Sequence, residues 1–147
     1  MKNERVGWLS FGLTVIFSLG MLWALIFAAI RCLAQISWFN SSDRGAVIAF
    51  FGFGIPMLLT AKATTHIWRH NQELMKVYGW VCSILACLFG LCLFGIIGYE
   101  TTAGEEIRSL AIVIFFFAFG IPMIILGNSG IRILYPTDPP NCMGDDC

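Results

Sequence analysis

Residues 47–57 read VIAFFGFGIPM and residues 113–123 read VIFFFAFGIPM, so nine of eleven positions are identical at an offset of 66. Leucine-rich stretches match easily by chance, but apolar composition alone does not explain a shared Phe-Gly-Ile-Pro-Met. We therefore interpret residues 1–66 and 67–132 as the two repeat halves of a duplicated helical hairpin.

The repeated motif lies in two of four long segments that carry no formal charge. The predicted membrane spans cover about 7–30, 45–61, 77–99 and 109–131. A bilayer core about 30 Å thick needs roughly 20 apolar residues as a helix, with a working range of about 17 to 25. Because lipid offers no hydrogen-bond partner, such runs form helices. The sequence predicts an all-α integral membrane four-helix bundle, with one transmembrane domain over 1–147.

The overall composition agrees with a membrane protein. Of the 147 residues, 58% are hydrophobic and 12% are charged, whereas soluble domains carry about 25% charged residues. So few charges cannot cover a water-facing surface, which excludes a cytosolic globular enzyme. Nine Lys and Arg balance nine Asp and Glu, so no net charge favours nucleic acid, and no nucleic-acid partner is expected.

The spacing of the two motif copies predicts how the halves are related. Two spans separate the copies, so the second and fourth spans run in the same direction. The fold is then built from two parallel-repeat transmembrane hairpins, related by a pseudo-two-fold axis along the membrane normal. Inverted repeats, which many alternating-access transporters contain, need an odd number of spans between the copies. The arrangement does not favour that class.

Lys and Arg in the short connections predict the orientation. Six of them lie before the first span, between the second and third, and after the fourth, against three on the opposite side. We predict that both termini are cytoplasmic, in a plasma or inner membrane. The proline-rich residues 133–147 are predicted to be a flexible tail. Asn40 begins a glycosylation acceptor on the predicted outer side, which matters only in a eukaryotic host.

Each copy of the motif carries a proline inside its span, Pro56 and Pro122. Proline has no amide hydrogen and crowds the carbonyl four residues earlier, which belongs to Gly52 in one copy and Ala118 in the other. We interpret these positions as structural kinks. The alternatives are exposed carbonyls that coordinate a cation or line a path, and a moving hinge.

Small residues mark candidate packing surfaces. Gly54 and Gly120 lie two residues before the prolines and give the helices smooth faces. Ala86 and Gly90 in the third span have the small-xxx-small spacing that lets membrane helices approach closely. We assign this pair to packing within the chain first and to an oligomer face second.

The predicted spans contain none of the groups that carry charge through lipid. No Asp, Glu, Lys, Arg or His lies inside them as bounded above, whereas proton-coupled carriers bury such groups. Cys82, Cys87 and Cys92 follow at intervals of five, which spreads them around a helix. They are interpreted as small apolar residues, and no cofactor is expected.

The connection between the second and third spans holds three candidate metal ligands. If the helix of the second span continued through it, His66, His70 and Glu73 would lie on one side, at i, i+4 and i+7. Two histidines and a carboxylate are transition-metal ligands, so these residues are weak candidates for a metal site. We favour a solvated basic surface near lipid headgroups.

Four further residues are candidates for contact with a partner. Trp68 and Arg69 lie in the same connection, where an amphipathic ring beside a cation suits the membrane interface. Cys142 and Cys147 lie in the tail beside two aspartates. The tail is extended rather than helical because of its prolines, and it offers a docking peptide.

These observations favour a non-catalytic polytopic membrane protein. We expect it to act through protein–protein contacts in the bilayer, as an accessory, inhibitory or immunity-type subunit, with lipid and another integral membrane protein or a second copy as partners. The alternative is a homo-oligomeric pore or small channel with the proline-kinked spans near the conduction path. An embedded enzyme that uses the two histidines is a third hypothesis.

Overall fold

The computed structural model describes residues 2–33, 45, 47–103 and 109–136. Within these residues every regular element is helical. The elements are α1 (Lys2–Leu33), the π-helix η1 (Phe50–Gly54), α3 (Ile55–Trp68), α4 (Gln72–Ala103) and α5 (Ser109–Leu134). Asn40, Cys142 and Cys147 lie outside the described residues, as does most of the predicted tail. The first two residues of that tail are helical, because α5 continues to Leu134.

Four stretches of the described chain are long and apolar enough to cross a membrane: Glu4–Arg31, Val47–Trp68, Gln72–Tyr99 and Val113–Leu134. The predicted all-α class and the number of membrane-length helices are therefore confirmed. The second of these stretches ends at Trp68, beyond the end near residue 61 that the sequence predicts.

The second and third spans are longer than expected where they meet. The helix of the second span runs on through Lys62 and His66 to Trp68, and α4 begins at Gln72 rather than near residue 77. Helix hydrogen bonds join backbone groups and continue through polar residues. A lysine near the end of a span reaches the interface along its aliphatic stem. The spans predicted by placing their boundaries at charged residues were therefore too short.

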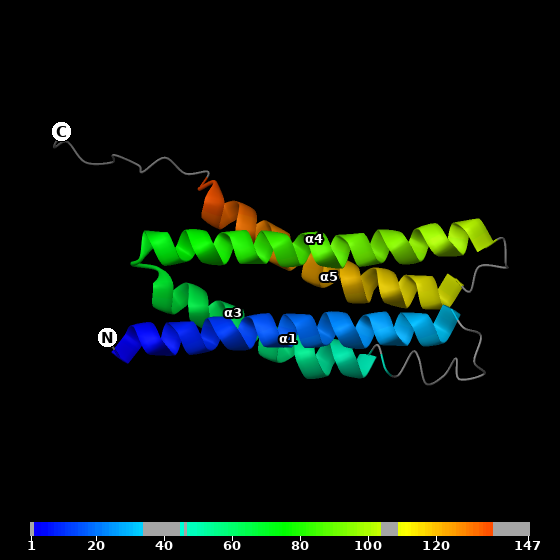
Figure 1. Ribbon diagram of the computed structural model, residues 1–147, viewed down its shortest axis with the longest axis horizontal. Coiled ribbons are helices and arrows are strands. Elements are labelled where there is room, and N and C mark those ends of the chain that lie inside the picture. Colours follow the sequence, from blue (N-terminus) through cyan, green and yellow to red (C-terminus); the bar gives the residue numbers. More distant parts are fainter. Residues whose placement is uncertain (1, 34–44, 46, 104–108, 137–147) are drawn as a thin grey trace.

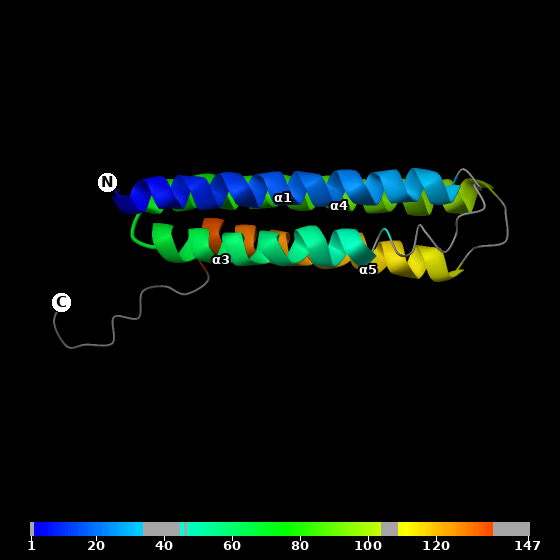
Figure 2. The same ribbon diagram turned by 90° about the horizontal axis from the view of Figure 1, so that it is seen from below.

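The helices form two hairpins that lie side by side. α1 packs along η1 and α3, and α4 packs along α5, whereas contacts between the two pairs are sparse. Figure 1 shows α3 and α5 running in the same direction, and Figure 2 shows α1 and α4 in one layer with α3 and α5 in the other. Each helix therefore has one face inside the bundle and one face outside.

Apolar side chains from all four spans fill the space between the helices. The largest fully buried ones include Met21, Leu25, Met57, Phe89, Phe119 and Leu126. Between α4 and α5 the packing depends on small residues. A Cβ added to Gly90 would lie 3.0 Å from Met123 Sδ, and one added to Gly127 would lie 3.6 Å from Ala86 Cβ. Ala86 and Gly90 are buried against α5, so neither is available as an oligomer face.

The two motif copies differ in helix type. The first contains the π-helical turn Phe50–Gly54 ahead of Pro56, whereas the second continues as an α-helix through Pro122. A π-turn shifts the backbone pairing by one residue, and next to a proline the α-helical ladder already lacks one bond. Gly52 lies in the π-turn, and the equivalent Ala118 lies in the α-helix. Alanine favours an α-helix over glycine by about 1 kcal/mol.

The glycines of the motif also have different surroundings. Gly54 is buried beside Met21, whose Sδ would lie 3.6 Å from an added Cβ. Gly120 is buried, yet an added Cβ would meet no atom within 4 Å. Pro56 is half-buried and Pro122 is fully buried. The hinge and carbonyl-ligand interpretations of the prolines stay predictions.

We predict that Gly52→Ala stabilises the protein by about 0.5–1 kcal/mol, because alanine has less backbone entropy to lose. An added Cβ at this position meets no atom within 4 Å, so no clash offsets the gain. Reversible unfolding in mixed detergent measures the effect, and Ala118→Gly is the matched control, expected to destabilise. A destabilised Gly52→Ala variant would show that the π-turn itself is required.

Candidate functional site

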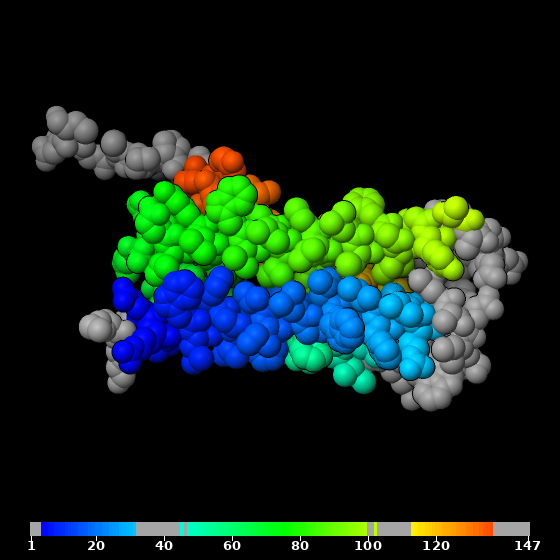
Figure 3. Space-filling view, in the orientation of Figure 1, coloured from blue at the N-terminus to red at the C-terminus, as the bar shows by residue number. Residues whose placement is uncertain are grey.

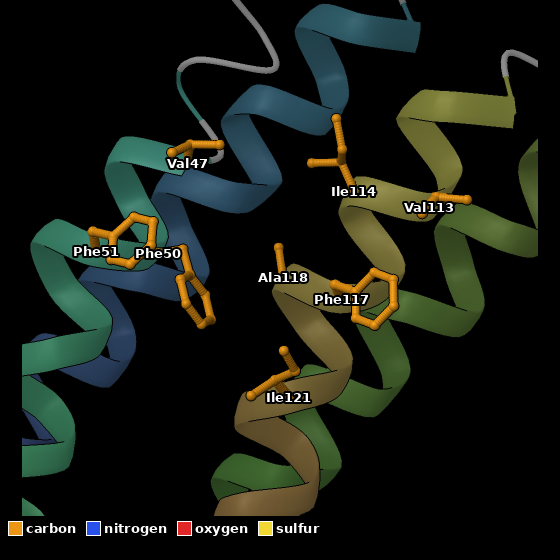
Figure 4. Close-up of a pocket in the computed structure, with 8 residues that line it drawn as sticks. All are labelled: Val47, Phe50, Phe51, Val113, Ile114, Phe117, Ala118 and Ile121. Atoms are coloured by element: carbon orange, nitrogen blue, oxygen red, sulfur yellow. The ribbon is translucent and has the colours of Figure 1, made fainter.

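An apolar slot lies between the second and fourth spans. It has a volume of about 220 Å³, and Figure 4 shows its lining side chains on two facing helices. The lining residues are Val47, Phe50, Phe51, Val113, Ile114, Phe117, Ala118 and Ile121. All of them have hydrocarbon side chains, so the slot offers no side-chain donor, acceptor or charge.

Equivalent positions of the repeated motif line the two walls of the apolar slot. Val47 corresponds to Val113, and Phe51 corresponds to Phe117, at the offset of 66. The slot was not predicted from the sequence. The motif is visible there, but a motif does not tell which face of each helix lies toward the other copy.

A cluster of hydroxyl groups joins α1 to α3. Ser10 Oγ donates to the carbonyl of Thr60 (2.9 Å), and Thr14 Oγ1 donates to Thr60 Oγ1 (2.9 Å). Thr64 Oγ1 lies 3.1 Å from Ser10 Oγ, and the Thr60 hydroxyl donates to the carbonyl of Pro56 (2.9 Å). In an apolar surrounding a polar group needs such partners. The hydroxyl cluster therefore fixes the pairing of the first two spans.

The hydroxyl cluster was not predicted from the sequence, because it contains no charged group and the spans were interpreted from their charged residues. The available signal was the spacing of four residues between Ser10, Thr14 and Ser18, repeated between Thr60 and Thr64. Residues four apart lie on one face of a helix. Which second helix would receive that face was not visible in the sequence.

Trp68 is a packing residue, so the expectation that it contacts a partner is wrong. Only 2% of its surface is exposed. The centroid of its ring lies 5.2 Å from the ring centroid of Trp8, 5.3 Å from that of Phe11 and 6.4 Å from that of Tyr78. The indole N–H has no hydrogen-bond partner among the described residues. It lies against Gly7, where a Cβ would overlap Nε1. The indole is large and mostly apolar, which favours burial between helices.

The three candidate metal ligands do not share a helix face. α3 ends at Trp68, His70 lies in a turn, and Glu73 belongs to α4. The expected continuous helix through residues 66–73 is therefore broken. Within the described ranges, no group of three or more His, Cys, Asp or Glu side chains is close enough to hold a metal ion.

The two histidines instead border a hollow at the end of the bundle. His66 and His70 line it together with Val6 and Ile67, and its volume is about 320 Å³. Glu73 is highly exposed and lies 3.5 Å from Lys76 Nζ. Arg69 is exposed in the turn. This end of the bundle has the polar and basic character that was expected near lipid headgroups.

The three cysteines of α4 differ in burial. Cys82 is buried, Cys87 is exposed and Cys92 is intermediate. Their different environments follow from the interval of five residues, which turns each successive side chain by about 140°. They do not form a shared thiol site.

No protein-family model, curated protein sequence or solved structure matches the chain. The candidate functional features of the described residues are the apolar slot, the hydroxyl cluster, the histidine hollow and the outward helix faces.

We predict that Thr14→Val destabilises the α1–α3 pair by about 0.6–1.7 kcal/mol, the range of single hydrogen bonds between membrane helices. A double-mutant cycle with Thr60→Val should show a coupling of similar size, measured by unfolding in mixed detergent. Thr65→Val is the control, because the Thr65 hydroxyl is exposed and bonds only the carbonyl of Lys62 on its own helix. Additive effects at positions 14 and 60 would contradict the role of the cluster.

We predict that Gly7→Ala destabilises the protein by about 1–3 kcal/mol, because the added methyl group overpacks the contact with Trp68. Gly12→Ala on the same helix is the matched control, since an added Cβ there meets no atom within 4 Å. Thermal unfolding of the detergent-solubilised protein compares the two variants. Equal stability of both would show that Trp68 does not pack against α1 in this way.

Proposed function

We propose that this chain is a non-catalytic polytopic membrane protein that acts through protein–protein contacts in the bilayer, as an accessory, inhibitory or immunity-type subunit. The observation that carries the proposal is a glycine on the outward side of α4. Gly95 is exposed, and a Cβ built on it meets no atom within 4 Å. Among the residues that the structure describes, no close contact explains a glycine there.

The surroundings of Gly95 suit a second helix. Ile84, Leu88 and Leu91 lie on the same side of α4, eleven, seven and four residues earlier, and all three are exposed. Figure 3 shows α4 along the upper edge of the bundle, with the C-terminal end of α5 beyond it at the left. Glycine in a helix costs about 1 kcal/mol relative to alanine, and small residues let membrane helices approach closely. A partner helix that crosses at Gly95 accounts for the residue.

The placement of the polar residues supports a non-catalytic role. The buried hydroxyls of Ser10, Thr14, Ser18 and Thr64 bond each other or backbone carbonyls. The side chains of His66, His70 and Glu73 lie exposed at one end of the bundle.

We also propose that the two hairpins are parallel repeats, related by a pseudo-two-fold axis along the membrane normal. The pairing of α1 with α3 has its counterpart in that of α4 with α5. The spans Val47–Trp68 and Val113–Leu134 are displaced by 66 residues at both ends, the same offset as the motif. The matching positions on the two walls of the apolar slot agree with such an axis.

The proposed orientation has both termini in the cytoplasm of a cell with a plasma or inner membrane. Six basic residues support it because they belong to the helix ends, or to the turn between them, that meet at one end of the bundle in Figure 1. They are Lys2, Arg5, Lys62, Arg69, Lys76 and Arg132. Cytoplasmic connections carry an excess of Lys and Arg.

The alternative, an oligomeric pore, places the conduction path between copies of the chain. The interior of a single bundle is filled by apolar side chains such as Leu25, Phe89 and Phe119 in the described residues. The hydroxyls near them are already hydrogen-bonded. The outward face around Gly95 is apolar as well, which suits contact with a helix better than contact with water.

We predict that Gly95→Leu abolishes association with an integral membrane partner, because the leucine occupies the space in which the partner helix would lie. The measurement is photo-cross-linking from a benzoylphenylalanine at Leu91 in the native membrane, followed by mass spectrometry of the adduct. The Gly95→Leu variant should retain wild-type stability, since its side chain points away from the bundle.

The control is Cys87→Leu, which adds similar bulk to the same helix. Cys87 is exposed and lies about 80° around the helix from Gly95, so the adduct should persist. An adduct between two copies of the chain would identify self-association instead. Lipid adducts alone, unchanged by Gly95→Leu, would contradict the proposed contact.

A further inference from the structure

We propose that the apolar slot binds the acyl chain of a membrane lipid, drawn from the leaflet at the end of the bundle where the stretches Val47–Trp68 and Val113–Leu134 begin. The inference concerns a different surface from Gly95 and does not depend on the proposed protein partner. It is carried by the juxtaposition of Val47, Phe50 and Phe51 on one span with Val113, Phe117 and Ile121 on the other.

The chemistry of the lining selects a hydrocarbon. None of the lining side chains has a polar atom, and the backbone behind them is helical. A polar ligand would lose its hydrogen bonds to water and gain none in the slot. Water gains nothing there either, because it needs two or more polar partners to occupy a cavity.

The slot is also too large to be an ordinary packing defect. Its volume is about 220 Å³, and an apolar cavity of about 150 Å³ already accepts a benzene molecule. An empty cavity is unfavourable in proportion to its volume because its lining lacks contacts. In a bilayer, hydrocarbon chains are the solvent at this position, so they are available to fill it.

The width of the occupant favours an acyl chain over a partner helix. An α-helix with its side chains is about 10 Å wide, whereas a single hydrocarbon chain is much narrower. The acyl chain therefore requires less space between the two spans than a helix does.

The position of the slot suits a lipid whose headgroup stays at the interface. Val47 and Val113 are the first residues of their membrane-length stretches. Ile121 lies eight residues beyond Val113, about 12 Å deeper along the helix. A chain that enters at the two valines and extends toward Ile121 lies along the bundle, as acyl chains do in a bilayer. Figure 4 shows the side chains of both helices along this length.

The test is photolabelling of the full chain in lipid nanodiscs. The probe is phosphatidylcholine with a diazirine on one acyl chain, present as a minor component of phosphatidylcholine, and adducts are mapped by mass spectrometry. Labelling of Phe51, Phe117 and Ile121 should exceed labelling of Leu91 and Phe94 several-fold. The last two are 69% and 72% exposed and report ordinary lipid around the protein, because the nanodiscs contain no other integral membrane protein that could cover Leu91.

Two variants narrow the slot from opposite walls. Val47→Phe and Val113→Phe should each reduce labelling of Phe51 and Ile121 to the level of Leu91. Val47 and Val113 are 49% and 48% exposed, so the larger ring has room at the mouth of the slot. Ile48→Phe is the matched control, because Ile48 is 70% exposed and does not line the slot.

Three results would overturn the proposal. The first is wild-type labelling of the slot no greater than that of Leu91. The second is slot labelling that survives in both narrowed variants. The third is a cross-link between two copies through slot residues, which would identify a second copy as the occupant. Equal loss of labelling in Ile48→Phe would likewise show that the effect does not arise from filling the slot.

Discussion

The structure depends on one constraint: a backbone that crosses hydrocarbon must satisfy its own hydrogen bonds. This is why each long apolar run is a helix and why the described chain consists of helices. The constraint applies to amide and carbonyl groups, not to side chains, so the helix of the second span continues through Lys62 and His66. Where proline removes an amide from the ladder, the same constraint is met in two ways, as a π-turn in one motif copy and an α-helix in the other.

The two hairpins are held together by different physical means. Between α1 and α3, hydroxyl groups bond across the helices, and Trp68 packs over Gly7. Between α4 and α5, Ala86 and Gly90 let the backbones approach, with Gly127 and Met123 opposite. Between membrane helices there is little hydrophobic drive, because lipid is as apolar as the side chains. Each pair therefore needs either hydrogen bonds or close packing to associate.

Contacts between the hairpins are sparse, and this has a consequence for binding. Two well-packed hairpins that meet loosely leave the apolar slot between the spans that carry the repeated motif. The outward face of α4 around Gly95 is a separate surface with a different shape. The slot has room for a chain, whereas the face around Gly95 permits a helix to approach. The molecule thus offers one surface suited to lipid and one suited to protein.

The sequence by itself determined the helical class, the number of membrane-length helices and the positions of the prolines. These follow from local composition, because an apolar run forms a spanning helix when it is long enough to cross a bilayer of known thickness. The burial of Trp68, the hydroxyl cluster, the broken alignment of His66, His70 and Glu73, and the apolar slot were decided only by the tertiary structure. Each depends on which face of one helix meets which face of another. In a span that is apolar all round, no contrast of polar and apolar residues marks that face in advance.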